Sequence, residues 1–272
     1  MSEEEALEAI LARVHARTGI DLQGYRRSTM RRRVANRMVG ARVDSLPRYL
    51  ELLDASPGET APLLESLLIK VSRFYRNAAA FDLVRREVLP ELAAAACGRP
   101  LRVWSAGCGR GEEAHTLAML LEERGLEGTV VATDVDDGAL AEAAAGTYAD
   151  GAVQELPGAL RSRYLERCAT KPGAWKVADA VRARIQWRHD DLARPDAGAE
   201  YDLVSCRNVL IYLDRPAQDR VFARLLASLA PAGYLFLGEA EWLPPARLPA
   251  VTAAWPRWRL FRAHAVPRRA AA

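Results

Sequence analysis

The residues best suited to bind a charged small molecule lie in a glycine-rich segment, residues 103–113, which reads V-W-S-A-G-C-G-R-G-E-E. Gly107 and the two further glycines lack a Cβ, so they permit a tight bend and a close approach of ligand to backbone. Dinucleotide-binding folds use such a turn to hold pyrophosphate. Here Glu112 and Glu113 follow at once, and their charges suit a cofactor with an ammonium and a sulfonium. The segment therefore favours S-adenosyl-L-methionine (SAM), although such turns are equally often plain tight turns.

A second group of candidate residues follows the next predicted strand, residues 129–133. An acid about 20 residues beyond a glycine-rich turn commonly accepts hydrogen bonds from ribose hydroxyls, and Asp134 lies closest to the strand. The alternative is that Asp134 or Asp136 caps the following helix. Residues 188–192, R-H-D-D-L, follow another predicted strand and are candidates for an adenine contact. For Asp190 within them we expect an ordinary surface acid of a loop.

A third group is the segment 206–214, which reads C-R-N-V-L-I-Y-L-D. Arg207 and Asn208 stand at the carboxyl end of a predicted strand, before apolar residues and Tyr212. Core packing alone does not account for an arginine and an asparagine at such a position. For Tyr212 the alternative is a half-buried tyrosine of the core.

Residues 25–48 contain eight arginines against one acid, Asp44. Met30, Val34 and Met38 form a narrow apolar stripe that docks this segment as a helix, so most guanidinium groups must face water or an anionic partner. A charge run is usually a solvated face, but eight to one favours a partner: RNA, a lipid surface or acidic helices.

The elements that must position these residues change character along the chain. The first 92 residues show helical periodicity, whereas short strands alternate with helices from residue 100 onward. This alternation predicts a mostly parallel, doubly wound sheet, with a domain boundary near 93–100 and a candidate β-excursion at 174–181. The expected helices are 4–15, 25–39, 47–53, 63–71, 78–92, 112–124, a helix ending at 145 and 222–229, and the expected strands are 101–105, 129–133, 185–188, 202–206 and 233–237.

Composition narrows the class of protein. The chain has 272 residues, is half hydrophobic, and carries a net charge of only +3. Its four cysteines and four histidines lack the spacing of a metal site, so we expect free thiols and no bound metal. The acidic N-terminus is unlike a signal peptide, and no apolar run approaches the ~20 residues that span a bilayer. These features favour a cytoplasmic protein without membrane insertion.

In combination, five segments resemble one known family. Residues 206–214 resemble the C-R-N-x-x-I-Y-F-D signature of the CheR-type chemotaxis receptor methyltransferases. Residues 25–38 resemble the family's arginine-rich helix, 72–76 (S-R-F-Y-R) its T-x-F-F-R motif, 104–113 its W-S-A…G-E-E turn, and 133–136 its S-D-I-D. The resemblance spans nearly the whole chain. It implies an all-α N-terminal domain at 1–92 and a Rossmann-like SAM-dependent methyltransferase domain at 93–272, with a small antiparallel β-subdomain inserted at about 160–185.

The resemblance also implies a role for each matching residue. The residues implied to be catalytic are Arg76, Arg207 and Tyr212. The residues implied to bind the cofactor are Lys70, Ser72, Arg76, Gly107, Glu113, Asp134, Asp191, Leu192, Arg207 and Asn208. Within this set, Glu113 would hold the amino-acid end of SAM and Asp134 its ribose.

Several positions depart from the family pattern. Lys70 and Asp191 stand where asparagine is common, and residues 238–241 read G-E-A-E in place of G-H-S-E. A-H-T replaces P-Y-S at 114–116, so His115 is expected to be a packing or pocket-edge residue, not a base.

The implied reaction is methyl transfer from SAM to glutamate side chains of chemoreceptors, which yields methyl esters and S-adenosyl-L-homocysteine. A glutamate with a pKa of ~4.3 is ionised at pH 7, so no general base is required. The arginine-rich segment 25–48 would bind receptor helices that carry glutamate pairs, and a monomer is the expected state.

Other functions remain open alternatives. A nucleic-acid methyltransferase would use the basic helix to hold phosphates, but it leaves 206–214 unexplained and lacks a base-stacking platform, so no nucleic acid is expected. A non-catalytic SAM-binding receptor adaptor is the second alternative, and the retained site residues argue against it. A small-molecule methyltransferase would not need the arginine-rich helix.

Overall fold

The computed structural model describes residues 1–68, 72–194 and 198–264 of the chain. It divides into two compact units: unit 1 comprises Met1–Ile69 and Tyr212–Gln218, and unit 2 comprises Lys70–Ile211 and Asp219–Ala272. The division lies earlier in the chain than the boundary predicted near 93–100. The reason is that Phe74 and Phe81 belong to the same buried cluster as Val103 of the sheet. These aromatic side chains join the helical stretch before the sheet to unit 2.

Unit 1 consists of helices with a short segment returning from later in the chain. A capping box formed by Ser2 and Glu5 starts the first helix. The returning segment is held by a β-bridge between Tyr25 and Leu213 and by a bond from the backbone N–H of Arg26 to the carbonyl of Tyr212. The elements of unit 1 before this segment are α1 (Glu3–Thr18), α2 (Arg27–Ala41), α3 (Leu46–Ala55), η1 (Pro57–Glu59) and α4 (Thr60–Leu67).

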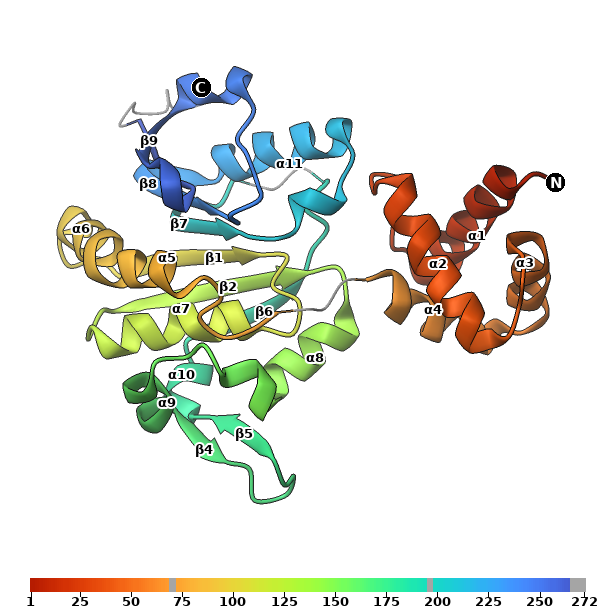
Figure 1. Ribbon diagram of the computed structural model, residues 1–272. Coiled ribbons are helices and arrows are strands. Elements are labelled where there is room, and N and C mark those ends of the chain that lie inside the picture. Colours follow the sequence, from red (N-terminus) through yellow and green to blue (C-terminus); the bar gives the residue numbers. More distant parts are fainter. Residues whose placement is uncertain (69–71, 195–197, 265–272) are drawn as a thin grey trace. The chain divides into compact units, whose positions relative to one another are not determined.

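Unit 2 is built on a seven-stranded sheet of order β6-β2-β1-β7-β8-β10-β9 (Figure 1). The first five strands in this order run parallel, and the last two pair antiparallel at one edge. The predicted strands correspond to the parallel five. The strands are β1 (Leu101–Ala106), β2 (Gly128–Asp134), β6 (Ile185–His189), β7 (Tyr201–Cys206), β8 (Leu229–Leu237), β9 (Val251–Trp255) and β10 (Leu260–Ala263).

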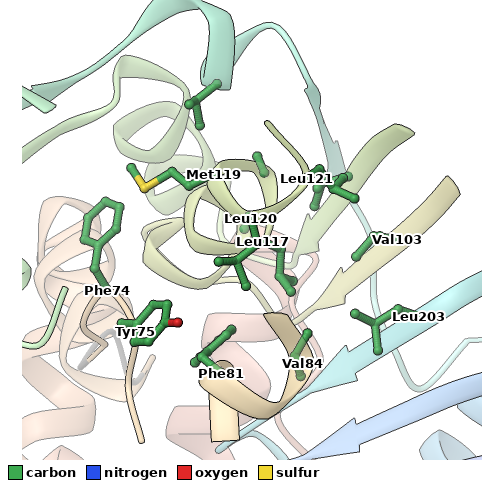
Figure 2. Close-up of a cluster of buried hydrophobic side chains, with 14 of the residues drawn as sticks. Phe74, Tyr75, Phe81, Val84, Val103, Leu117, Met119, Leu120, Leu121 and Leu203 are labelled. Carbon is green, nitrogen blue, oxygen red and sulfur yellow. The ribbon is translucent and has the colours of Figure 1, made fainter. Parts of the chain in front are cut away.

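Helices cover both faces of this sheet. Val103 on β1 packs with Leu117 and Phe81 in the main hydrophobic cluster (Figure 2). The next residue, Trp104, points to the opposite face, where the guanidinium of Arg224 lies 5.2 Å from its ring centroid. The other helical elements are α5 (Ala78–Leu83), η2 (Val84–Val88), α6 (Leu89–Ala96), α7 (Glu112–Glu123), α8 (Asp137–Ala145), η3 (Asp150–Val153), α9 (Gly158–Tyr164), α10 (Asp179–Arg182), η4 (Leu210–Tyr212), α11 (Arg215–Ala227), η5 (Pro245–Ala250) and η6 (Pro256–Trp258).

A second, three-stranded antiparallel sheet is inserted between β2 and β6, in the order β3-β5-β4. It confirms the predicted small β-subdomain, although its first strand lies before the expected range of 160–185. The strands are short and weakly alternating, which explains why the sequence indicated only one of them, β5, within the expected excursion at 174–181. They are β3 (Thr147–Ala149), β4 (Leu165–Arg167) and β5 (Ala174–Val177).

The predicted fold class, a Rossmann-like α/β domain with a helical N-terminal part, is confirmed, and its details differ in two places. Helix α11 begins at Arg215, earlier than the expected residue 222, because Pro216 is tolerated in a first helical turn. The two antiparallel strands, β9 at the edge of the sheet and β10 beside it, were not predicted, since neither shows a clear apolar alternation. No helix in the described ranges is long and apolar enough to cross a membrane.

Candidate functional site

The candidate site lies where β1, β2 and β7 end, at the centre of the parallel sheet. The strand order reverses here, because β1 is flanked by β2 on one side and β7 on the other. Open α/β sheets bind ligands at such a switch point, outside the carboxyl ends of the strands. The glycine-rich turn after β1 is fastened to β2: the N–H groups of Gly107 and Cys108 donate to the carbonyl of Thr133 at 2.8 and 2.9 Å.

The three glycines of the turn serve different purposes. All have positive φ, which favours glycine. A Cβ on Gly107 would lie 2.6 Å from Cγ2 of Val209, and one on Gly111 would lie 2.7 Å from the ring of Trp187. A Cβ on Gly109 would meet nothing within 4 Å. The turn is thus packed closely at both ends and open at its centre, which leaves a cradle for a ligand.

Glu113, in the first turn of α7, faces two partners. Its Oε1 accepts a hydrogen bond from the hydroxyl of Ser105 at 2.9 Å, and its Oε2 lies 3.4 Å from Nη1 of Arg207. Its neighbour Glu112 is buried instead, and burial raises the pKa of that carboxyl to about 7. The acidic pair that the sequence treated as one feature therefore separates into one polar contact residue and one buried acid.

Asp134 closes the other side of the turn. Its carboxylate accepts bonds from the backbone N–H groups of Gly109 at 2.8 Å and Asp136 at 3.0 Å. Burial raises the pKa of Asp134, and these backbone bonds oppose that effect. Asp136 accepts from the N–H of Ala139 at 3.1 Å and caps α8. The cap is therefore made by Asp136, while Asp134 lies against the glycine-rich turn.

The segment after β6 lies beside Asp134, since the N–H of Asp190 donates to the carbonyl of Asp134 at 3.0 Å. Asp190 was expected to be a surface acid, and this expectation is wrong: its carboxylate is ion-paired with the buried guanidinium of Arg224. Arg224 also donates to the carbonyl of Asp191 at 2.7 Å. The ion pair fixes this segment, on which Leu192 is buried and Asp191 half-buried.

Arg207, directly after β7, is a buried cation. Its guanidinium lies over the rings of Phe81 and Phe236, at 4.9 and 4.5 Å from their centroids, and these two rings contact each other edge to face. Its Nη2 donates to the carbonyl of Arg76 at 2.9 Å and to Oδ1 of Asn77 at 2.8 Å. Burial lowers the pKa of Arg207, opposed by Glu113. Its Nε is buried without a partner in the described residues, so this N–H is available to a bound acceptor.

The segment carrying Ser72 and Arg76 reaches the same site. It is fixed by a bond from the N–H of Tyr75 to the hydroxyl of Thr116 on α7, at 3.1 Å. The backbone carbonyl of Arg76 binds Arg207 as described above, and Ser72 is half-buried four residues earlier. Lys70 lies outside the described residues.

Tyr212 belongs to unit 1, where its carbonyl accepts from the N–H of Arg26 at 2.9 Å. Its predicted position opposite Arg207 across the methyl group stays a prediction. Asn208 belongs to the site through its backbone, which adopts a positive φ of 62° directly after Arg207.

Two residues that hold Arg207 or its loop escaped the sequence reasoning. Asn77, which receives a bond from Arg207, directly follows the S-R-F-Y-R segment and adopts a positive φ of 64°. Glu241 accepts hydrogen bonds from the backbone of the Arg207 loop. Its presence in the G-E-A-E stretch, after the last parallel strand, was the available signal.

His115 is a fully buried packing residue. Its Nδ1 lies 3.0 Å from the carbonyl of Gly111 and 3.0 Å from the hydroxyl of Tyr148. Burial lowers the pKa of His115 to about 4, so the ring is neutral near pH 7. No cluster of potential metal ligands occurs in the part of the chain that the structure describes.

Several positive charges of the arginine-rich segment 25–48 are matched by acidic side chains in the structure. Four arginines of the segment pair with acids of unit 1, and three of those acids lie outside the segment. Arg26 donates to the carbonyl of Leu213 at 3.1 Å, and Arg32, Arg33 and Arg42 have no acidic partner within the described ranges. The prediction was that most of the eight guanidinium groups face water or an anionic partner, and four of them find an anionic partner within unit 1. The pairs are Arg27–Glu8, Arg31–Glu4, Arg37–Glu59 and Arg48–Asp44.

The residues present fit SAM. Gly109 leaves open space at the centre of the turn, Glu113 offers a carboxylate suited to an ammonium, and Asp134 offers a carboxylate against the turn that is suited to hydroxyl groups. A carboxylate oxygen can accept more than one bond, so the backbone bonds of Asp134 leave capacity for a hydroxyl. The unpartnered Nε of Arg207 suits an acceptor such as the carboxylate of the amino-acid moiety.

Comparisons with known proteins agree with this site. Residues 70–254 match the family model of the CheR methyltransferase SAM-binding domain, and residues 5–68 match that of the CheR all-alpha domain. Chemotaxis protein methyltransferase 2 of Pseudomonas aeruginosa is 32% identical over 87% of this chain and 86% of its own length. The chemotaxis protein methyltransferase of Listeria monocytogenes is 31% identical over 82% of this chain and 84% of its own length.

A third relative shows that the match can lie within a longer protein. An uncharacterized 104.1 kDa protein of Rhodobacter capsulatus is 36% identical over 87% of this chain, but the match covers only 25% of that protein. The two family models together span the helical unit, the glycine-rich turn and the Arg207 loop. The chain therefore belongs to the CheR methyltransferase family, and its cofactor is S-adenosyl-L-methionine.

Proposed function

We propose that the protein transfers a methyl group from SAM to glutamate side-chain carboxylates of chemoreceptors, and so forms methyl esters as a protein-glutamate O-methyltransferase. The observation that carries the proposal is the buried Arg207, which contacts the rings of Phe81 and Phe236 and lies beside Glu113. In this pair Arg207 supplies a cation that can orient carboxylates, and Glu113 supplies a carboxylate that can bind the ammonium of SAM. The names of the chemotaxis methyltransferase relatives support the choice of receptor as substrate.

The proposed reaction requires the protein to align the two reactants and does not require it to transfer a proton. SAM supplies a methyl group on a sulfonium, and an ionised carboxylate displaces it in line. Since a glutamate is ionised near neutral pH, no base is needed, in keeping with the buried, neutral His115. Proximity and orientation can contribute about 7–11 kcal/mol. Arg207 is suited to this task because two hydrogen bonds and two aromatic faces fix its guanidinium.

Arg76 and Tyr212 complete the proposed catalytic set. The backbone carbonyl of Arg76 accepts a bond from Arg207, and its side chain is proposed to guide the incoming carboxylate by a single contact. A bidentate clamp would weaken the nucleophile by neutralising it. Tyr212 is proposed to keep the methyl donor and acceptor in line.

The proposed partner surface is the part of α2 and the following loop that carries Arg32, Arg33 and Arg42. These side chains have no acidic partner among the described residues and suit acidic receptor helices. Such a surface would steer the receptor by long-range attraction, and methylation then removes a negative charge from it. Chemoreceptor signalling domains imply that the reaction takes place in the cytoplasm.

The test is transfer of radiolabelled methyl from SAM to purified receptor cytoplasmic fragments, followed by mild alkali. Label released as volatile methanol is expected, because carboxyl methyl esters hydrolyse. Arg207→Ala protein, checked for folding by circular dichroism, serves as the control. Alkali-stable label would contradict the proposal and indicate methylation of nitrogen. Absence of label on every receptor fragment, from protein that binds SAM by calorimetry, would favour a non-catalytic adaptor.

A further inference from the structure

Glu241 is a buried carboxylate that the cofactor site, as described above, does not explain. It follows β8, and its side chain is directed into the backbone of the neighbouring loop after β7. Oε1 accepts from the N–H groups of Val209 at 2.9 Å and Leu210 at 2.7 Å. Oε2 accepts from those of Asn208 at 2.9 Å and Gly238 at 2.7 Å. One carboxylate thus binds four backbone N–H groups, three of them consecutive.

The arrangement is costly to build, which argues that it has a purpose. Glu241 is only 3% exposed, and burial raises its pKa while the four backbone bonds oppose this. A buried charge is tolerated only when hydrogen bonds replace its hydration. Gly238 leaves no room to spare, since a Cβ there would lie 2.7 Å from Oε2. The loop itself contains Asn208 at a positive φ of 62°, a conformation that needs support.

The clamped loop contacts the cofactor site in two places. Its first residue, Arg207, directs its guanidinium to Glu113 and to the carbonyl of Arg76. Its third residue, Val209, packs against the glycine-rich turn, where only a missing Cβ on Gly107 allows the contact. A shift of this loop would therefore displace the cation beside Glu113 and the wall behind the turn together.

We propose that Glu241 is a positioning residue for the cofactor site. Its carboxylate fixes residues 207–210, so that Arg207 reaches Glu113 and Val209 supports the turn at Gly107. Glu241 acts through this loop and none of the contacts above places it on the cofactor. The inference depends on the SAM site and is independent of which carboxylate receives the methyl group.

The test is binding of S-adenosyl-L-homocysteine by titration calorimetry to Glu241→Gln protein. Glutamine keeps the shape but replaces one oxygen with an amide that cannot accept, so two of the four N–H groups lose their partner. Affinity is expected to fall about tenfold or more. Glu241→Asp retains both oxygens on a shorter arm, and an intermediate affinity is expected for it.

Asp202→Asn provides the matched control. Asp202 is also a buried carboxylate, it accepts from the backbone N–H of Arg102 at 2.8 Å, and it pairs with Arg99. It lies near the start of β7, at the end of the strand away from Arg207. Its loss should lower the unfolding temperature and leave the affinity for the ligand unchanged, which separates positioning from general stability.

Two results would overturn the proposal. One is a Glu241→Gln protein that binds S-adenosyl-L-homocysteine as tightly as the wild type. The other is an equal loss of affinity in Asp202→Asn. If Glu241→Gln does not fold, Glu241→Asp and Val209→Ala decide the question: the proposal requires both to bind more weakly, and wild-type affinity in both would refute it. Because no receptor is used, these outcomes do not depend on the proposed substrate.

Discussion

The guanidinium of Arg207 and the carboxylate of Glu113 meet 3.4 Å apart, measured from Nη1 to Oε2, on side chains that are 3% and 13% exposed. The pair joins the end of β7 to the start of α7, across the carboxyl edge of the parallel sheet. At that distance the contact is a weak hydrogen bond, which leaves Glu113 able to bind a second cation such as the ammonium of SAM.

Arg207→Lys should reduce methyl transfer by about a hundredfold, although the charge is kept. A lysine ammonium lacks the planar set of donors of a guanidinium, and it cannot lay a flat group against the rings of Phe81 and Phe236 as arginine does. Initial rates at saturating SAM and receptor fragment measure this effect. Phe81→Leu is the comparison, since it removes one of the two stacking faces; a Lys variant with normal turnover would show that planarity is irrelevant.

Asp134→Asn should weaken binding of SAM by about tenfold, because an amide offers one acceptor oxygen where two are engaged by Gly109 and Asp136. Asp136→Asn is the matched control. Asparagine caps helices as well as aspartate does, so the cap of α8 and the affinity for SAM should both persist. Titration calorimetry measures the affinity of both variants for SAM. An equal loss of affinity in the two would mean that the effect comes from local folding and not from ribose binding.

Much of this site could be predicted because its signals are local in the sequence. The glycine-rich turn, the strand-end Asp134 and the Arg207 segment each depend on a few consecutive residues. The contacts between them could not be predicted. Four N–H groups meet Glu241, and Arg224 reaches Asp190, only when distant segments pack together. The ion pairs of the arginine-rich segment could not be predicted for the same reason, since Glu59 reaches Arg37 from outside the segment.

Gly107→Ala should weaken binding of SAM more than an ordinary glycine substitution does. The new Cβ would meet Cγ2 of Val209 at 2.6 Å, in a backbone conformation with a φ of 72°. Adding Val209→Ala removes the atom that is struck but not the strain of the backbone, which costs about 1 kcal/mol. We therefore expect partial recovery of affinity in the double variant. Strictly additive losses in the double-mutant cycle, read by calorimetry, would contradict the contact between the two residues.

Neutralising unpaired arginines of the basic surface should raise the KM for receptor fragments. Arg32→Ala and Arg42→Ala are each expected to raise it about two- to fivefold at low salt, with turnover unchanged. Arg48→Ala removes the same charge, but Arg48 already pairs with Asp44 at 3.1 Å, so a smaller effect is expected. Repeating the assay at high salt should bring the three variants together. If Arg48→Ala raises KM as much as the others, then net charge, and not this surface, is responsible.

Glu112 and His115 should give opposite pH dependences to the stability of unit 2. Burial raises the pKa of Glu112 from 4.5 to about 7 and lowers that of His115 from 6.5 to about 4. Glu112, whose pKa is raised, contributes stability that is complete below pH 4.5 and is lost as the pH rises through 7. His115, whose pKa is lowered, contributes stability that is present above pH 6.5 and is lost as the pH falls through 4.

In the wild type the two slopes oppose each other between about pH 4.5 and 6.5, at up to about 1.4 kcal/mol per pH unit for each proton. Relative to the wild type, Glu112→Gln should become more stable as the pH rises across this window, and His115→Gln should become less stable. Urea unfolding at several pH values measures both differences. Parallel slopes in the two variants would mean that the two groups do not titrate in opposite senses, and the neutral, buried state assigned to His115 would then be wrong.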